Sequence, residues 1–331
     1  MGNHARVAVI TGGTAGVGRA TALHFAQEGF DVAILARGEE GVSSTVEELK
    51  ACGGRVLGLP VDVSDAAQVE RAADQVENDL GPIDVWVNVA MNTVIAPVNE
   101  MTPEEYKRVT DVTYLGAVNG TLAALKRMQP RDHGTIVQTG SALAYRSIPL
   151  QSAYCAAKAA LRGFTDSLRS ELIHDKSRVR LTMVHLPGIN TPQFEWARNK
   201  LSHRVQPVAP IYQPEVAARA IFDAARRAPR EIWLGKATLQ SILGNMVFPG
   251  MLDKLLAKQA YSGQMTDEPE TPMRPDYLYE PVESLHRTHG RFSQNAKNKA
   301  ISVDSHMVGV TVLALAGLGI AALTRGRKRK R

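Results

Sequence analysis

Cysteine is rare in this sequence, and clustered metal ligands are missing. Only Cys52 and Cys155 occur in 331 residues, and the nine histidines are scattered along the chain. So few thiols exclude a disulfide framework and are typical of a protein from a reducing compartment. Because no His, Cys, Asp and Glu residues have the spacing of a metal site, we expect no bound metal. Internal repeats are also missing, which excludes a repeat architecture.

The sequence has no excess of positive charge outside the end of the chain. The formal net charge is +6, and the segment 324–331 alone holds six Lys and Arg residues. The rest of the chain is therefore close to neutral, so the basic balance does not indicate a nucleic-acid-binding surface. The N-terminus also lacks the charged and then apolar pattern of a signal sequence. We expect no nucleic-acid partner.

The N-terminal segment has the order strand, glycine-rich turn, helix. Residues 6–10 form a β-branched run typical of a buried parallel strand, and they lead into a turn with glycines at 12, 16 and 18. Gly12 permits a tight turn, Gly16 lets the backbone approach a pyrophosphate, and Gly18 allows close packing of helix on strand. The helix that follows, residues 19–28, offers free N–H groups to phosphates. This order predicts a dinucleotide site.

Short apolar strands alternate with helical stretches along the first 235 residues. We expect strands at 31–36, 55–61, 83–88, 134–139, 179–185 and 231–235. We expect helices near 40–51, 65–80, 103–128, 152–175 and 214–228. This alternation predicts an α/β fold of the Rossmann type, in which helices cover both faces of a doubly wound parallel sheet of about seven strands.

A tyrosine and a lysine stand four residues apart in an Ala-rich stretch that favours a helix. Tyr154 and Lys158 therefore share one helix face, and Ser141 precedes them at the end of a predicted strand. A free phenol loses its proton near pH ~10, and a neighbouring cation lowers that pKa toward the range of a general acid or base. The serine hydroxyl would hold a carbonyl oxygen against the phenol. Tyr-x-x-x-Lys also occurs by chance on helices, so its meaning depends on the nucleotide site before it.

Taken together, these motifs resemble the short-chain dehydrogenase/reductase family over about residues 5–235. The resemblance implies that Ser141, Tyr154 and Lys158 are catalytic and that Lys158 also holds the nicotinamide ribose. It further implies that Asp62 contacts the adenine and that the turn at Pro187 closes over the nicotinamide. We expect the cofactor to be bound by Thr11, Gly12, Gly16, Val17, Gly18, Arg37, Asp62, Val63, Asn88, Tyr154, Lys158, Pro187, Gly188 and Thr191.

The chain departs from the family pattern at two positions. Thr113 stands where the family often has an asparagine that positions a water linking the active-site lysine to solvent. One hydroxyl holds a water differently, so the proton relay is expected to change. Met91 replaces the usual glycine after the fourth strand, which indicates an altered wall near the cofactor.

A basic residue follows the second predicted strand. Arg37, with Gly38 beside it, would pair with a 2′-phosphate, whereas an acidic residue there would bind a ribose 2′-OH. We therefore expect NADP(H) as the cofactor. A solvated arginine at a strand end is common, so NAD(H) remains the alternative.

The C-terminal third adds segments of different character to the domain at 1–235. Residues 236–264 are helical and apolar, and they would pack on the domain, bind a partner or lie on lipid. Residues 265–306 are polar and read as an extended or disordered linker. Residues 307–323 form an apolar run without charge, about 25 Å long as a helix, which is the short limit for a membrane span. The basic tail 324–331 follows, and a buried soluble helix is the alternative for the run before it.

These observations predict an oxidoreductase that transfers hydride between NADP(H) and a carbonyl or alcohol, on a membrane-associated chain whose catalytic domain lies in the cytoplasm. The tail would either span the bilayer once or enter part-way, with its basic cluster on anionic headgroups. A lipophilic substrate and a homo-oligomer are expected. Two other functions stay open, namely a catalytically silent cofactor-binding scaffold and a membrane-recruitment protein.

Overall fold

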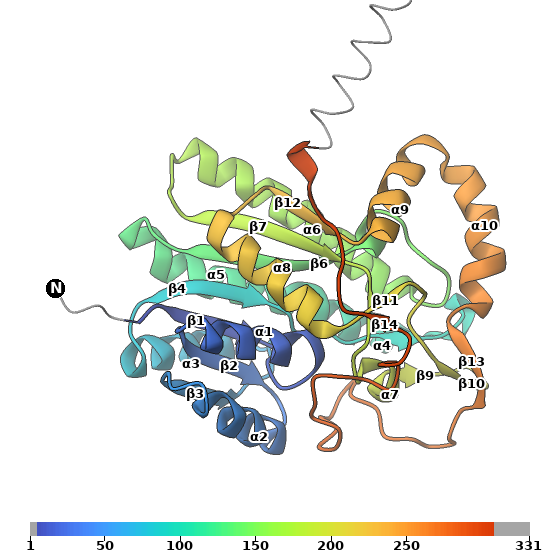
Figure 1. The fold of residues 1–331 in the computed structure, drawn as a ribbon, viewed down its shortest axis with the longest axis horizontal. Coiled ribbons are helices and arrows are strands. Elements are labelled where there is room, and N and C mark those ends of the chain that lie inside the picture. The colour runs from blue at the N-terminus through green and yellow to red at the C-terminus, as the bar shows by residue number, and fades with distance from the viewer. Residues whose placement is uncertain (1–4, 308–331) are drawn as a thin grey trace, which may run out of the picture.

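The computed structural model describes residues 5–307, and an eight-stranded sheet lies at its centre (Figure 1). The sheet order is β3-β2-β1-β4-β6-β7-β12-β15. Its strands are β1 (Val7–Thr11), β2 (Asp31–Ala36), β3 (Val56–Pro60), β4 (Ile83–Asn88), β6 (Thr135–Ser141), β7 (Arg180–Leu186), β12 (Glu231–Leu234) and β15 (Ser302–Asp304). The seven expected strands pair in parallel, whereas β15 pairs antiparallel with β12. The expected count of about seven is corrected to eight, because the C-terminal segment returns to the sheet edge.

Helices cover both faces of this sheet, as the alternating pattern predicts. On one face α1 and α8 pack together, with the rings of Phe25 and Phe222 in edge contact over the strands. On the other face α3, α5 and α6 bury Val76, Leu125 and Leu168 against the sheet. The helices are α1 (Gly16–Gln27), α2 (Glu39–Lys50), α3 (Ala66–Asp79), α4 (Pro103–Thr110), α5 (Gly116–Met128), α6 (Ser152–His174) and α8 (Pro214–Arg227).

The stretch 103–128, expected as one helix, is two helices joined by a wider turn. A π-helical turn at Asp111–Leu115 separates α4 from α5. The buried hydroxyl of Thr113 in this turn donates to the carbonyl of Asn92 at 2.9 Å and accepts the Asn92 N–H at 3.0 Å. This pair of bonds joins the turn to the loop after β4. Widened turns of this kind are frequent at functional sites.

The polar segment expected as a linker lies along the domain in short strands and turns. β13 (Met265–Pro269) pairs with β10 (His203–Val205), and β14 (Ala296–Lys297) pairs with β11 (Ile211–Tyr212). Three of its apolar side chains are buried, since Leu278 is 0% exposed and Tyr277 and Phe292 are 8% exposed. Further short elements are β5 (Val94–Ile95), β8 (Gly188–Ile189), β9 (Arg198–Asn199), α7 (Gln193–Trp196) and 3-10 turns at Val98–Glu100, Gln129–Arg131 and Ala142–Ala144.

The helical extension forms a hairpin of two helices. α9 (Lys236–Val247) and α10 (Pro249–Ser262) meet at Phe248, and both lie at one end of the sheet (Figure 1). Within residues 5–307, we find no helix with both the length and the apolar character that a membrane crossing needs. Apart from Met307, the predicted membrane segment 307–323 lies outside the described residues.

Candidate active site

The glycine-rich turn has the geometry that its sequence predicts. Gly12 and Gly16 adopt φ values of +69° and +54°, which L side chains rarely occupy. A Cβ on Gly16 would lie 2.8 Å from the Thr191 methyl carbon, and one on Gly18 would overlap the carbonyl oxygen of Gly12. Among the described residues, no side chain caps the start of α1, which leaves the N–H groups of its first turn without a side-chain acceptor. The turn therefore fits a dinucleotide pyrophosphate.

A cavity of about 390 Å³ runs along the carboxyl ends of the parallel strands. Open α/β sheets bind ligands at this edge. The predicted site residues that line it are Gly12, Gly16, Val17, Gly18, Arg37, Asp62, Val63, Ser141, Tyr154, Lys158, Pro187, Gly188 and Thr191. Met91 also forms part of the wall, as its position after the fourth strand suggests.

Two predicted cofactor residues support the cavity from behind it. The Thr11 hydroxyl oxygen accepts the N–H groups of Val89 and Ala90, at 3.0 and 3.2 Å, and so ties the glycine turn to the loop after β4. The Asn88 amide points into the core, where it donates to the side chains of Thr121 and Gln138, both at 3.1 Å. These residues shape the wall through the backbone next to them.

Strand β6 and helix α6 bring the three predicted catalytic residues together. Ser141 ends β6, and Tyr154 and Lys158 lie one turn apart near the start of α6. The Lys158 Nζ donates to the carbonyl of Thr139 at 2.7 Å and lies 5.7 Å from the centre of the Tyr154 ring. Lys158 is only 3% exposed. The hydroxyl and the ammonium therefore flank the phenol inside one cavity.

Burial dominates the pKa values of this group. It raises the pKa of the Tyr154 phenol above the ordinary 10.0, although a hydrogen bond with Ser141 opposes the rise. Burial also lowers the pKa of Lys158 to about 8. In this structure desolvation of the phenol outweighs the expected acidification by Lys158, because both groups have left water.

A buried polar cluster behind Ser141 was not identified from the sequence. The His185 Nδ1 lies 3.0 Å from the backbone carbonyl oxygen of Ser141, and its Nε2 lies 3.3 Å from the Glu231 carboxylate. Tyr145 and Trp233 both donate to the same carboxylate oxygen, at 2.5 and 3.0 Å. These bonds hold the pKa of Glu231 at about 2. The residues of this cluster come from β7, β12 and the turn after β6. Because they are far apart in the sequence, local spacing does not predict the cluster.

A segment far along the chain crosses the nucleotide end of the cavity. Residues 277–287, here called the strap, contribute Tyr277, Val282 and His286 to the cavity wall. The strap carbonyls also accept hydrogen bonds from two predicted cofactor residues, Arg37 and Gly16, and from Arg19 of α1. These bonds run from the Arg37 guanidinium to the carbonyls of Tyr277 and Tyr279, from Arg19 to His286 at 2.6 Å, and from the Gly16 N–H to Arg287 at 3.0 Å.

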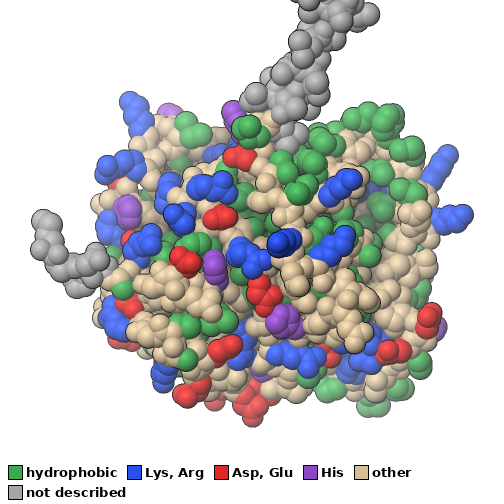
Figure 2. All heavy atoms as spheres, viewed as in Figure 1, with side chains coloured by type: hydrophobic (Ala, Val, Ile, Leu, Met, Phe, Trp, Pro, Cys, Tyr) green, Lys and Arg blue, Asp and Glu red, His purple; other side chains and the backbone are tan. Residues whose placement is uncertain are grey.

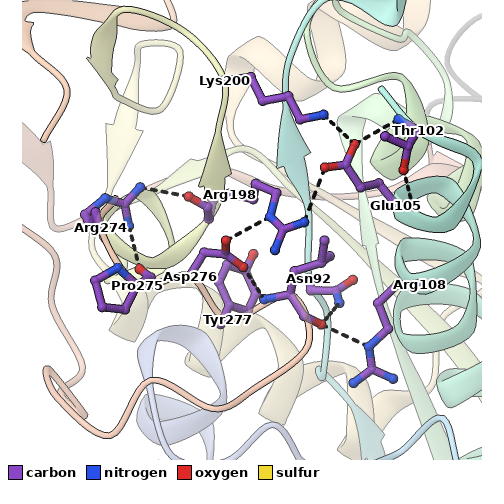
Figure 3. Close-up of polar contacts among 12 residues, drawn as sticks. Asn92, Thr102, Glu105, Arg108, Arg198, Lys200, Arg274, Pro275, Asp276 and Tyr277 are labelled. Carbon is purple, nitrogen blue, oxygen red and sulfur yellow. Dashed lines mark hydrogen bonds and ion pairs between the residues drawn. The ribbon is translucent and has the colours of Figure 1, made fainter. Parts of the chain in front are cut away.

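Ion pairs just before the strap fix its start. Arg198 lies between Asp276 and Glu105, at 2.8 and 3.3 Å, and Lys200 binds the other Glu105 oxygen at 2.8 Å (Figure 3). The carbonyl of Leu278 accepts hydrogen bonds from the Arg108 guanidinium at 2.9 Å and from the side-chain amide of Asn92 at 3.3 Å. The polar composition of this segment suggested a free linker, whereas its charges pair with loops that are distant in the chain.

The other end of the cavity is apolar. Phe194 and Trp196 are half-buried and line the cavity. Leu143 and Ile148 join them from the turn after β6, and Leu256 and Ala260 of α10 complete this wall. The cavity is therefore lined by apolar side chains between Tyr154 and α10.

Comparisons with known proteins agree with this geometry. A family model described as short chain dehydrogenase matches residues 6–201. A Bacillus subtilis (strain 168) protein named uncharacterized oxidoreductase YxnA is 33% identical over 285 residues, which cover 85% of this chain and 80% of that protein. A solved variant of actinorhodin polyketide ketoreductase with NADPH has 30% identity and a TM-score of 0.55, covering 58% of this chain and 74% of that one. An alcohol dehydrogenase from the archaeon Thermococcus sibiricus, complexed with 5-hydroxy-NADP, has 26% identity and a TM-score of 0.57, covering 67% and 90%.

Proposed function

Because the chain belongs to the short-chain dehydrogenase family, we propose that it is an oxidoreductase that transfers a hydride between a nicotinamide cofactor and a carbonyl or alcohol. The observation that carries this proposal is the meeting of Ser141, Tyr154 and Lys158 in the cavity that the glycine turn borders. A nicotinamide bound there supplies or accepts the hydride. The chain's own residues handle the oxygen and its proton.

The proton chemistry follows from the environment of the phenol. The Ser141 and Tyr154 hydroxyls hold the substrate oxygen, and Tyr154 donates its proton to that oxygen in reduction. Burial keeps the phenol protonated, which suits the role of an acid. In oxidation the Tyr154 phenolate accepts the proton of the alcohol. The Lys158 ammonium, held by the Thr139 carbonyl, stabilises this phenolate, which is also what reduction leaves behind.

The proposal includes a preference for NADP(H) over NAD(H). Arg37 follows β2 at the cavity wall, and burial, followed by the nearby guanidinium of Arg108, lowers the pKa of Arg37. Two arginines at this end support binding of a 2′-phosphate. The Glu283 carboxylate of the strap lies against Gly38 at the same place, so the strap must shift before a 2′-phosphate fits.

A screen of carbonyl compounds with the purified full chain tests the proposal. We expect loss of NADPH absorbance with at least one apolar ketone or aldehyde, and slower turnover with NADH. NADPH binding without turnover of any compound in the panel would contradict the proposed enzymatic function and favour a cofactor-binding scaffold. Separation of the full chain by size tests the expected homo-oligomer, and the NADPH assay on each fraction shows which assembly is active.

A further inference from the structure

The tip of the α9–α10 hairpin exposes a continuous apolar run. Met246, Val247, Phe248 and Met251 are 62%, 64%, 57% and 61% exposed, and Leu255 of α10 is 41% exposed. Contiguous apolar surface of this kind marks an interaction site. Figure 2 shows these helices as a group of green side chains at the upper right, with Lys and Arg side chains projecting beside them.

The same two helices turn their other faces to the active site. Ala237, Thr238 and Ser241 of α9 line the cavity, together with Leu256 and Ala260 of α10. The hairpin therefore places a thin wall between the apolar end of the cavity and the exposed tip.

Polar bonds hold the hairpin to the catalytic part of the molecule. Arg146 pairs with Asp253 of α10 at 2.5 Å, and the Asn245 amide of α9 donates to the Tyr145 carbonyl at 3.0 Å. Gln151, the residue before α6, donates to the side chain of Gln264 at 2.7 Å. The exposed tip is thus a fixed projection, positioned relative to the helix that carries Tyr154.

Charge on the hairpin indicates which surface would cover the tip. Lys236, Lys254 and Lys258 are exposed, and the acidic Asp253 is already paired with Arg146. A second copy of this hairpin would bring like charges together, whereas anionic phospholipid headgroups complement them. Side chains such as Met, Val and Phe with lysines beside them suit the boundary between headgroups and acyl chains.

The end of the described chain supports the same surface. The Gly235 N–H, at the start of α9, donates to the carbonyl of Ile301 at 2.8 Å, and β15 then leads to Met307. Ile301 and Met307 are 51% and 61% exposed. The sequence continues from there with the apolar run 307–323 and the basic tail 324–331. A membrane contact by the hairpin is compatible with the predicted anchor.

We propose that the tip of the α9–α10 hairpin enters an anionic phospholipid bilayer and that a lipophilic carbonyl or alcohol passes from the acyl region along the hairpin to Tyr154. The substrate route rests on the proposed oxidoreductase function. The docking itself does not, and it is tested without turnover.

The docking test uses the full chain with Cys52→Ser and Phe248→Cys carrying an environment-sensitive fluorophore, while Cys155 stays buried. The control carries the fluorophore through Val98→Cys, since Val98 is 63% exposed on a remote turn. With phosphatidylcholine vesicles that contain about one quarter phosphatidylglycerol, we expect a blue shift and quenching by brominated acyl chains only at position 248. A label at 248 that stays in water while the protein cosediments through its tail would overturn the docking. A blue shift that depends on protein concentration without vesicles would show a second copy instead, and would overturn it too.

The route test compares Phe248→Ser with Val98→Ser. For a long-chain ketone supplied in the vesicles, we expect kcat/KM of Phe248→Ser to fall about tenfold, while a short water-soluble ketone in buffer is reduced at the unchanged rate. Equal rates for the vesicle-borne ketone in both variants would overturn the route. If no carbonyl is reduced by any form of the enzyme, the proposed function fails while the fluorescence result still decides the docking.

Discussion

The backbone N–H of Gly16 donates to the carbonyl oxygen of Arg287, 3.0 Å away, across 271 positions of the chain. Gly16 starts α1, where a pyrophosphate is bound in a dinucleotide site. The strap therefore occupies donors that a cofactor needs, and it does so again at Arg37. Nucleotide binding must displace these bonds, so the apparent affinity depends on how firmly the strap is fixed.

Loosening the strap should tighten nucleotide binding. In Asp276→Ala, the pair with Arg198 and the bond to the Leu278 N–H are lost. We expect the Kd for NADPH to fall roughly three- to tenfold, because a larger fraction of molecules presents free donors. Fluorescence titration measures this, with Asp267→Ala on exposed β13 as the control. A Kd that rises in Asp276→Ala would show that the strap holds the nucleotide instead.

Tyr154→Phe should remove turnover and leave cofactor binding intact. The ring still fills its place, but the proton donor is gone. We expect kcat to fall by about three orders of magnitude, with the Kd for NADPH unchanged. Single-turnover absorbance and titration on one preparation separate the two. Retained turnover in this variant would exclude Tyr154 as the acid.

Lys158→Met should stabilise the fold while it abolishes activity. The folded pKa of Lys158 is about 8, below its ordinary 10.5, so at pH 7 folding includes the burial of a cation. Methionine removes the free-energy cost of burying this cation, and we expect the free energy of unfolding to rise by about 2 kcal/mol. As pH rises from about 8 to 10.5 the wild-type chain gains stability, so the difference should shrink there. Urea unfolding at pH 7 and pH 10 measures it, and a less stable variant at pH 7 would contradict the argument.

Arg37→Ala should shift the cofactor preference. Loss of a charge-assisted bond to a 2′-phosphate is worth about 1.5–3 kcal/mol, so we expect kcat/KM for NADPH to fall at least tenfold. NADH has no such group, and its kcat/KM should stay the same. Arg71→Ala, on the exposed face of α3, is the control. An equal change with both cofactors would contradict a role of Arg37 in binding the 2′-phosphate.

Glu231→Gln should destabilise the protein in a pH-dependent way. The folded pKa of Glu231 is about 2 against an ordinary 4.5, so its carboxylate stabilises the fold above pH 4.5, and that stability is lost as pH falls toward 2. We expect the variant to lose about 3 kcal/mol at pH 7, and the gap to narrow between pH 4.5 and 2. Because His185 links Glu231 to the Ser141 backbone, KM for the carbonyl substrate should also rise. Parallel unfolding curves with a constant gap at every pH would contradict this.

Local patterns in the sequence predicted the parallel sheet, the helices on its two faces, the glycine turn and the pair formed by Tyr154 and Lys158. They succeeded because each depends on residues within one turn or one strand: positive φ needs glycine, and positions i and i+4 share a helix face. The family resemblance added Ser141, whose place at the end of β6 also follows from the strand pattern.

Only the tertiary structure decided how distant segments meet. It turned the Asn88 amide into the core, joined Thr113 to Asn92, placed His185 between Ser141 and Glu231, and laid residues 277–287 over the nucleotide end of the cavity. These contacts join residues up to 271 positions apart. A sequence periodicity reports which face of an element is apolar, but it carries no information on which distant carbonyl will satisfy a given donor.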